Sequence, residues 1–186
     1  MADITKLRKM TGAGMMDCKN ALTEAEGDFD KAVEIIRKKG QAVAAKRSDR
    51  EAAEGCVLAK SENGYAALIA LKCDTDFVAK NADFVALTTE ILDLAIANKA
   101  ADLEAVKALS LGGATVGDAV VDRSGITGEK MELDGYSFVT GETTVAYIHP
   151  GNKLATIVAL NQAGIDAQVA RDIAMQVAAM NPIAVD

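Results

Sequence analysis

The sequence contains no tryptophan, a single histidine and aromatic residues at only 4% of its 186 positions. So few aromatic side chains leave little material for the stacking platforms that bind single-stranded nucleic acids. The formal net charge of −7 also means that the chain lacks the excess of lysine and arginine that neutralises phosphate backbones. We therefore expect no direct binding to nucleic acid.

Cysteine is scarce too, and its three positions, Cys18, Cys56 and Cys73, are far apart in the chain. No CxxC pair is present, and one histidine with scattered cysteines supplies too few ligands, so we expect no metal site and no cofactor. Separated cysteines in odd number indicate free thiols in a reducing compartment. One alternative is a thiol enzyme, with Cys18 paired with His149, or Cys73, as the nucleophile. No third group that would orient such a pair is evident in the sequence. We expect no catalytic residue and no enzyme.

Long apolar runs are also missing. The run Ala66–Leu71 is far shorter than the ~20 residues that a membrane-spanning helix needs. The first residues lack the basic and apolar regions of a signal peptide. These absences predict a cytoplasmic protein that does not bind membranes.

Apolar residues at helical spacing predict three short helices within residues 1–40, separated by breaks at Thr11–Gly14 and at Gly27. Gly40 is expected to end the third helix. A bundle this small has a thin core and is more typical of a docking unit than of an enzyme. Residues 41–54 combine charges with alanines and are expected to form a partly helical linker.

The remainder alternates strand and helix patterns. Asn63-Gly64 predicts a tight hairpin turn, and the returning strand Tyr65–Cys73 is apolar enough to be covered on both faces. Asn81 is expected to cap a long helix. The predicted fold is α+β, with small antiparallel sheets packed on helices. We expect further helices over residues 103–109, 116–122 and 166–180, strands over 130–139, 144–149 and 153–160, a core N-subdomain at 55–140 and a partial C-subdomain at 141–186.

A polar segment with one aromatic residue, Asp74–Lys80, follows the apolar strand and is expected to be a turn. Phe77 within it has two interpretations. It is either a core aromatic beneath the hairpin or an exposed side chain among its charged neighbours. Asp74 and Asp76 are more typical of helix caps than of calcium ligands, since the calcium-loop spacing is absent.

Two segments carry a resemblance to a known family. The first comprises Leu7-Arg8 and Thr11–Lys19, and the second is Thr75–Lys80. Both resemble hallmark stretches of the bacterial translation elongation factor Ts family, in the right order and at a suitable separation. Weaker similarities follow at Gly128-Glu129, at Tyr147–His149 and near Pro182. The resemblance extends over the whole chain and implies that it corresponds to the N-terminal part of the family pattern, with the C-terminal region missing.

This resemblance implies a guanine-nucleotide exchange factor for the GDP form of elongation factor Tu in protein synthesis. The N-terminal helices would form a bundle like a ubiquitin-associated domain, which docks on the nucleotide-binding domain of the partner. Arg8, Met15 and Met16 match contact positions there. Adjacent methionines at a helix start point in different directions, so we expect one of them in the core.

The resemblance also implies an exchange loop formed by Thr75, Asp76, Phe77 and Val78. Phe77 would wedge between side chains of the partner and, with Asp76, disturb its magnesium site. His149 matches a contact to a different domain of the partner. The absence of a GxxxxGK[ST] stretch fits a factor that acts on another protein's nucleotide.

An alternative is an adaptor that binds ubiquitin-like folds or peptides without exchange activity. Thr75–Lys80 distinguishes the two, because an adaptor has no use for it. The sequence departs from the family at Lys130, where asparagine is usual, and at Asp134-Gly135, where basic residues are usual. Without the family's C-terminal strand, the second sheet would have an open edge, which we expect to allow pairing into a homodimer.

Overall fold

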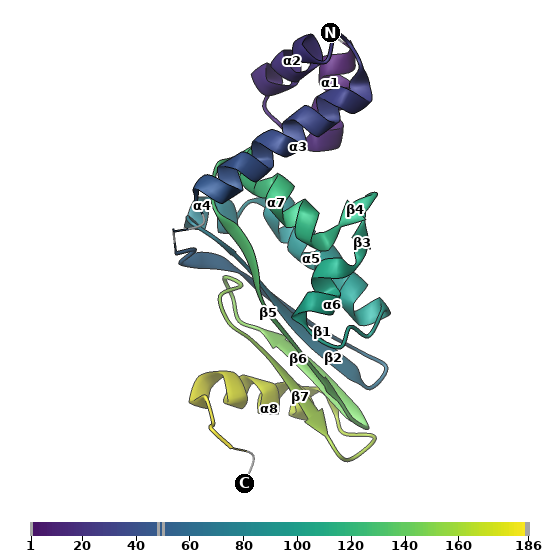
Figure 1. Cartoon of the computed structure of the whole chain (residues 1–186). Helices are drawn as coiled ribbons and strands as arrows, with labels where there is room; N and C mark the ends of the chain where they lie inside the picture. Colours follow the sequence, from purple (N-terminus) through teal and green to yellow (C-terminus); the bar gives the residue numbers. More distant parts are fainter. Residues whose placement is uncertain (1, 48, 50, 185–186) are drawn as a thin grey trace.

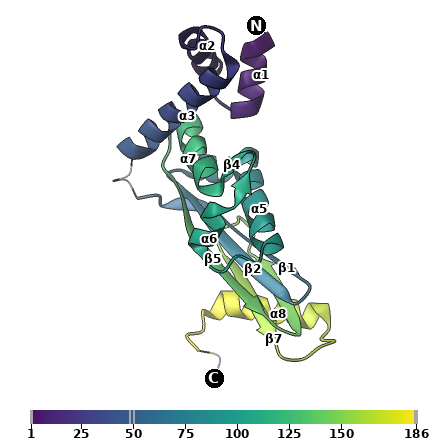
Figure 2. The ribbon, with the colours of Figure 1, turned by 45° about the vertical axis from the view of Figure 1, so that its right-hand side comes forward.

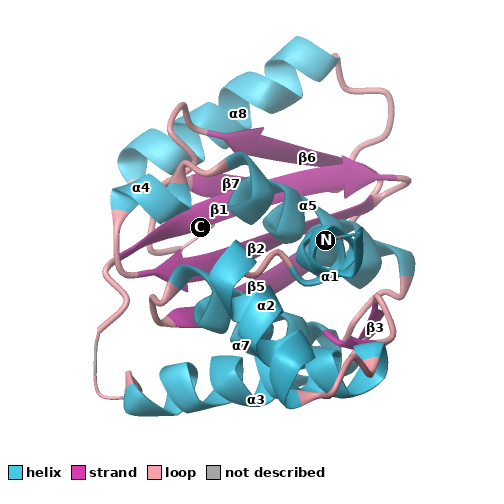
Figure 3. Cartoon of the chain, turned by 90° about the horizontal axis from the view of Figure 1, so that it is seen from above, coloured by secondary structure: helices cyan, strands magenta, loops and turns pink. Residues whose placement is uncertain are grey.

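The computed structural model describes residues 2–47, 49 and 51–184 and has the expected α+β architecture. The molecule is elongated, with the N-terminal helices at one end and the C-terminal helix at the other (Figure 1). Seen from above, the strands run side by side between helices (Figure 3). Buried apolar residues form two clusters, one within the N-terminal helices and a larger one between the central sheet and the helices above it.

The N-terminal bundle packs around small and aliphatic side chains. Leu7, Cys18 and Ala32 have no exposed surface and belong to its core. Asp28 begins the third helix, because its side chain accepts a hydrogen bond from a backbone N–H in the first turn, at 3.1 Å. The helices are α1 (Ala2–Thr11), α2 (Met15–Glu24) and α3 (Phe29–Lys46).

The prediction that Gly40 ends the third helix is wrong, since α3 continues to Lys46. Gly40 lies where α3 crosses α7 (Val116–Thr127). A Cβ added to Gly125 would lie 2.1 Å from the Cα of Gly40. The two glycines therefore allow the helix backbones to touch, which any larger residue at position 125 would prevent.

An arginine reinforces this crossing. Arg37 Nε donates a hydrogen bond to Asp122 at 3.2 Å, and the guanidinium also lies 3.9 Å from a carboxylate oxygen of Asp118. These contacts join the long helix of the bundle to the core. Residues 48 and 50 of the expected linker lie outside the described residues, and the domain boundaries stay predictions.

The central sheet has three antiparallel strands in the order β1-β2-β5. Asn63 and Gly64 have φ angles of 51° and 73°, which confirms the predicted tight turn between β1 and β2. The middle strand is buried along most of its length, as its apolar sequence predicted. The strands are β1 (Glu54–Glu62), β2 (Tyr65–Cys73) and β5 (Met131–Thr140).

Helices cover one face of this sheet (Figures 1 and 2). The capping prediction for Asn81 is confirmed, because its side chain accepts the N–H of Asp83 at 2.8 Å. The sequence did not predict the hairpin of β3 (Ser110–Leu111) and β4 (Ala114–Thr115), since such short strands give no periodic signal. The covering helices are α5 (Ala82–Ala97), α6 (Leu103–Ala108) and α7.

The second sheet, β6 (Thr143–Ile148) with β7 (Ala155–Leu160), packs against the opposite side of the first (Figure 1). Its outer face carries α8 (Ala167–Met180). Ser61 Oγ donates to the backbone oxygen of Thr144 at 2.8 Å, which ties β1 to β6. The layers are therefore helices, sheet, sheet and helix.

The unusual Asp134-Gly135 pair marks an irregularity in β5. Gly135 pairs with Ala70, but the next pair joins Leu133 to Leu71, so Asp134 is the extra residue of a bulge. Its carboxylate forms an ion pair with Lys72 at 2.7 Å. The departure from the family pattern thus has a local structural explanation.

The close helix crossing predicts a specific sensitivity. Gly125→Ala should lower the free energy of unfolding by about 1–3 kcal/mol, because the new methyl group has no space against Gly40. That corresponds to a fall in melting temperature of about 2–4 °C for each kcal/mol. The control is Gly117→Ala in the same helix, whose Cβ would meet its nearest atom at 3.5 Å. Calorimetry should find Gly117→Ala unchanged or more stable; equal melting of both variants would contradict the close contact.

Candidate functional site

The segment Thr75–Val78 is part of a short helix and not the turn that the sequence predicted. α4 (Asp76–Ala79) begins just beyond the end of β2, and Thr75 is its N-cap residue. Ala79 is buried and Val78 packs against the main core. Because a single helical turn cannot bury all of its side chains on one side, Phe77 is left to point outward.

Phe77 has 84% of its surface exposed, so its interpretation as a core aromatic is wrong. Burying such a side chain is worth about 1.5–3 kcal/mol, a gain that the free protein forgoes. Beside it, Lys80 Nζ donates to Asp76 at 2.7 Å. This hydrogen bond lowers the pKa of Asp76, so the carboxylate is charged at neutral pH. The helix therefore presents an aromatic ring next to a fixed negative charge.

His149 follows β6 and is exposed. Its Nδ1 atom lies 2.9 Å from the hydroxyl of Tyr147, and its backbone N–H donates to Leu154 across the turn at 2.8 Å. The same turn reaches the start of β1, where Lys153 Nζ lies 2.7 Å from the Glu54 carboxylate. Because β1 starts opposite the end of β2, this turn and α4 lie at the same end of the core.

Arg8, Met15 and Met16 lie on the bundle, and all three are exposed. Met15 and Met16 have 59% and 65% of their surface exposed, so the prediction that one of them is in the core is wrong. The inward face of α2 is instead supplied by Cys18 and Ala21. These residues lie on the bundle, whereas Phe77 and His149 lie at the ends of strands of the core.

The three cysteines are buried and unpaired. Burial raises the pKa of Cys73 to about 12 and also raises that of Cys56. Neither thiol is a thiolate at neutral pH, which argues against a nucleophilic role for these two residues. Within the described ranges, no three His, Cys, Asp or Glu side chains come together to hold a metal ion.

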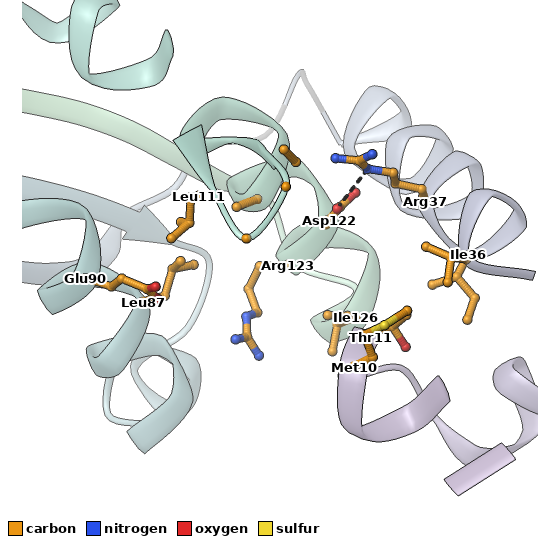
Figure 4. A pocket seen from close by; sticks show the side chains of 15 residues that line it. Met10, Thr11, Ile36, Arg37, Leu87, Glu90, Leu111, Asp122, Arg123 and Ile126 are labelled. Atoms are coloured by element: carbon orange, nitrogen blue, oxygen red, sulfur yellow. Dashed lines mark hydrogen bonds and ion pairs between the residues drawn. The ribbon is translucent and has the colours of Figure 1, made fainter. Parts of the chain in front are cut away.

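A cavity of about 460 Å³ lies beside the crossing of α3 and α7, between the bundle and the core (Figure 4). Ile126, Leu87 and Leu111 form apolar walls, and Arg123 extends into the space (Figure 4). Burial raises the pKa of Asp122 at its margin. The sequence analysis did not predict this cavity, because its lining comes from six separate elements. None of the predicted site residues lines it.

Taken together, these features define an α+β protein with exposed candidate residues on its helical bundle and around α4. The family model described as elongation factor TS matches residues 74–186. The chain is 72% identical over its whole length to elongation factor Ts of Bacteroides thetaiotaomicron, and 65% identical over 98% of its length to that of Porphyromonas gingivalis. The chain belongs to the elongation factor Ts family. It spans 56% of the length of the first of these relatives and 67% of the second.

The exposure of Phe77 predicts that it contributes little to folding. Phe77→Ala should change the free energy of unfolding by less than about 0.5 kcal/mol, as is usual for surface positions. The matched control is Phe84→Ala, since Phe84 is 1% exposed in the main core and its truncation should be destabilising by about 3–5 kcal/mol. Urea unfolding of both variants tests this; comparable losses would mean that Phe77 packs in solution.

Proposed function

We propose that this chain is a guanine-nucleotide exchange factor that acts in protein synthesis on the GDP form of elongation factor Tu. The observation that carries the proposal is the exposed Phe77 beside the charged Asp76, within the segment Thr75–Lys80 that resembles the family's hallmark. Membership of the elongation factor Ts family supports it. Thr75 caps the helix that presents Phe77 and Asp76, and Val78 packs that helix against the core.

The mechanism follows from how a magnesium ion holds a guanine nucleotide. The ion bridges phosphate oxygens to the protein, so a partner that displaces it weakens nucleotide binding. Phe77 would gain burial energy only in an opened form of elongation factor Tu and so would favour that form. Asp76 brings a carboxylate, the kind of group that competes for magnesium. By linkage, bound nucleotide lowers the affinity of elongation factor Tu for this chain by the same ratio as this chain lowers its affinity for nucleotide.

Docking would use further surfaces to hold the wedge near its target. We assign Arg8 and the exposed Met15 and Met16 to contact with the nucleotide-binding domain of the partner. Methionine is suited to this because its flexible, polarizable side chain adapts to irregular surfaces. His149 would contact a different domain. Attachment at separate points raises the effective concentration of Phe77 at the nucleotide site.

The alternative function is an adaptor that binds ubiquitin-like folds or peptides through the bundle alone. Such an adaptor gains nothing from an exposed phenylalanine on α4, which leaves apolar surface in water. The exposed Phe77 therefore favours the exchange factor. An adaptor would bind its partner without changing the rate of nucleotide release.

The proposal predicts that the chain accelerates release of a fluorescent GDP analogue from elongation factor Tu and hydrolyses no nucleotide alone. Phe77→Ala should reduce the stabilisation of the opened partner by roughly 2–4 kcal/mol, the range of an interface hot spot. Phe138→Ala is the control, because Phe138 is 41% exposed and pairs with Ala67, toward the other end of β2. If saturating chain leaves GDP release unchanged, the exchange function is refuted.

Self-association through the second sheet stays a proposal. Among the strands that the structure describes, β7 pairs with β6 alone, so its other edge is available for a second copy. Light scattering should detect a dimer; a strictly monomeric chain at high concentration would contradict it.

A cytoplasmic location and the absence of nucleic-acid and membrane binding also stay predictions. Over the described part of the chain, no helix is long and apolar enough to span a bilayer.

A further inference from the structure

The one-turn helix that carries Phe77 is tied to a residue more than 50 positions away in the sequence. The backbone N–H of Thr75 donates to one carboxylate oxygen of Glu129 at 3.0 Å, and its hydroxyl donates to the other at 2.6 Å. Both hydrogen bonds are charge-assisted, and together they fix the orientation of the N-cap residue. An isolated helical turn is unstable in water, so α4 depends on such external contacts.

Glu129 is itself positioned by the end of α7. Gly128 terminates that helix in a left-handed conformation with φ of 70°, which turns the chain toward β5. The N–H of Glu129 donates to Thr127 Oγ1 at 3.2 Å. The carboxylate that holds Thr75 is thus built on the C-terminal cap of α7, the helix that crosses α3.

The bundle reaches the same segment through a second contact. Arg47, the C-cap residue of α3, places Nη1 3.3 Å from Asp74, immediately before Thr75. Asp74 has 14% of its side-chain surface exposed, so this ion pair is partly shielded from water. The N–H of Lys130 also donates to Asp74 at 3.3 Å. Residues just beyond the ends of two helices therefore hold the start of the α4 segment: Arg47 after α3 of the bundle, and Glu129 and Lys130 after α7 of the core.

We propose that Glu129 is a positioning residue, which holds Thr75 through two hydrogen bonds so that α4 presents Phe77 at a fixed angle to the partner. This inference rests on the proposed exchange function. Without the carboxylate, the N-cap loses both acceptors and α4 moves relative to β2. Docking surfaces on the bundle are untouched, so the partner still binds while fewer encounters place the ring correctly.

Glu129→Gln tests this in the full chain, because it keeps the side-chain shape but sets an amide N–H₂ against one of the two donors of Thr75. We expect the maximal rate of GDP release to fall roughly ten- to a hundredfold, the scale of loss for misplaced functional groups. The half-saturating concentration should stay within about twofold, since docking energy is retained. The control is Glu132→Gln on β5, whose carboxylate is 49% exposed and pairs with Lys130 at 3.4 Å.

Hydrogen exchange of the free chain gives a readout that needs no partner. Amides of residues 77–80 should exchange faster in Glu129→Gln than in wild type or Glu132→Gln, while amides of β2 and α5 keep their protection. Unchanged exchange over residues 77–80 overturns the positioning role, as does faster exchange throughout the core. A raised half-saturating concentration with a normal maximal rate would also overturn it, by making Glu129 a docking residue. The wild-type chain could fail to release GDP from elongation factor Tu while Glu129→Gln still speeds hydrogen exchange over residues 77–80. That result would refute the nucleotide-exchange function but would support the tether between Glu129 and Thr75.

Discussion

The close crossing of α3 and α7 is the contact on which the arrangement of this molecule depends. Gly40 and Gly125 bring the two helix backbones together, and Arg37 holds the pair with carboxylates from α7. Because backbone contact leaves no room for sliding, the bundle has one favoured position on the core. The same α7 ends at Thr127, two residues before Glu129, which tethers α4. A single helix thus connects the bundle to the presentation of Phe77.

Phe77 and His149, two of the candidate recognition residues, lie outside the buried core. The main core is formed by β2 and the apolar face of α5, where Ile69, Leu71 and Ile91 have no exposed surface. The candidate recognition residues lie at element ends, where the chain leaves the core: Phe77 after β2 and His149 after β6. A residue at such a place can be substituted without loss of the fold, and the strand before it still fixes its position.

Three carboxylates lie in and around the α4 segment. Asp76 is paired with Lys80 and Asp74 with Arg47, whereas Glu129 accepts two hydrogen bonds from the N-cap residue Thr75. These carboxylates orient the segment, but only that of Asp76 lies on the helix that presents Phe77. The α4 helix therefore presents an exposed aromatic ring beside a carboxylate that is paired with Lys80.

Several local features were predictable from the sequence alone. The Asn63-Gly64 turn, the cap at Asn81 and the apolar strand β2 were predictable because backbone sterics and periodicity act over a few residues. The hallmark segments gave the family. Tertiary structure decided the rest: Gly40 is a crossing point and not a helix end, and Met15 and Met16 both face solvent. The tether from Glu129 to Thr75 and the cavity beside α7 join residues distant in sequence, and local patterns carry no signal for such contacts because they depend on how the elements pack.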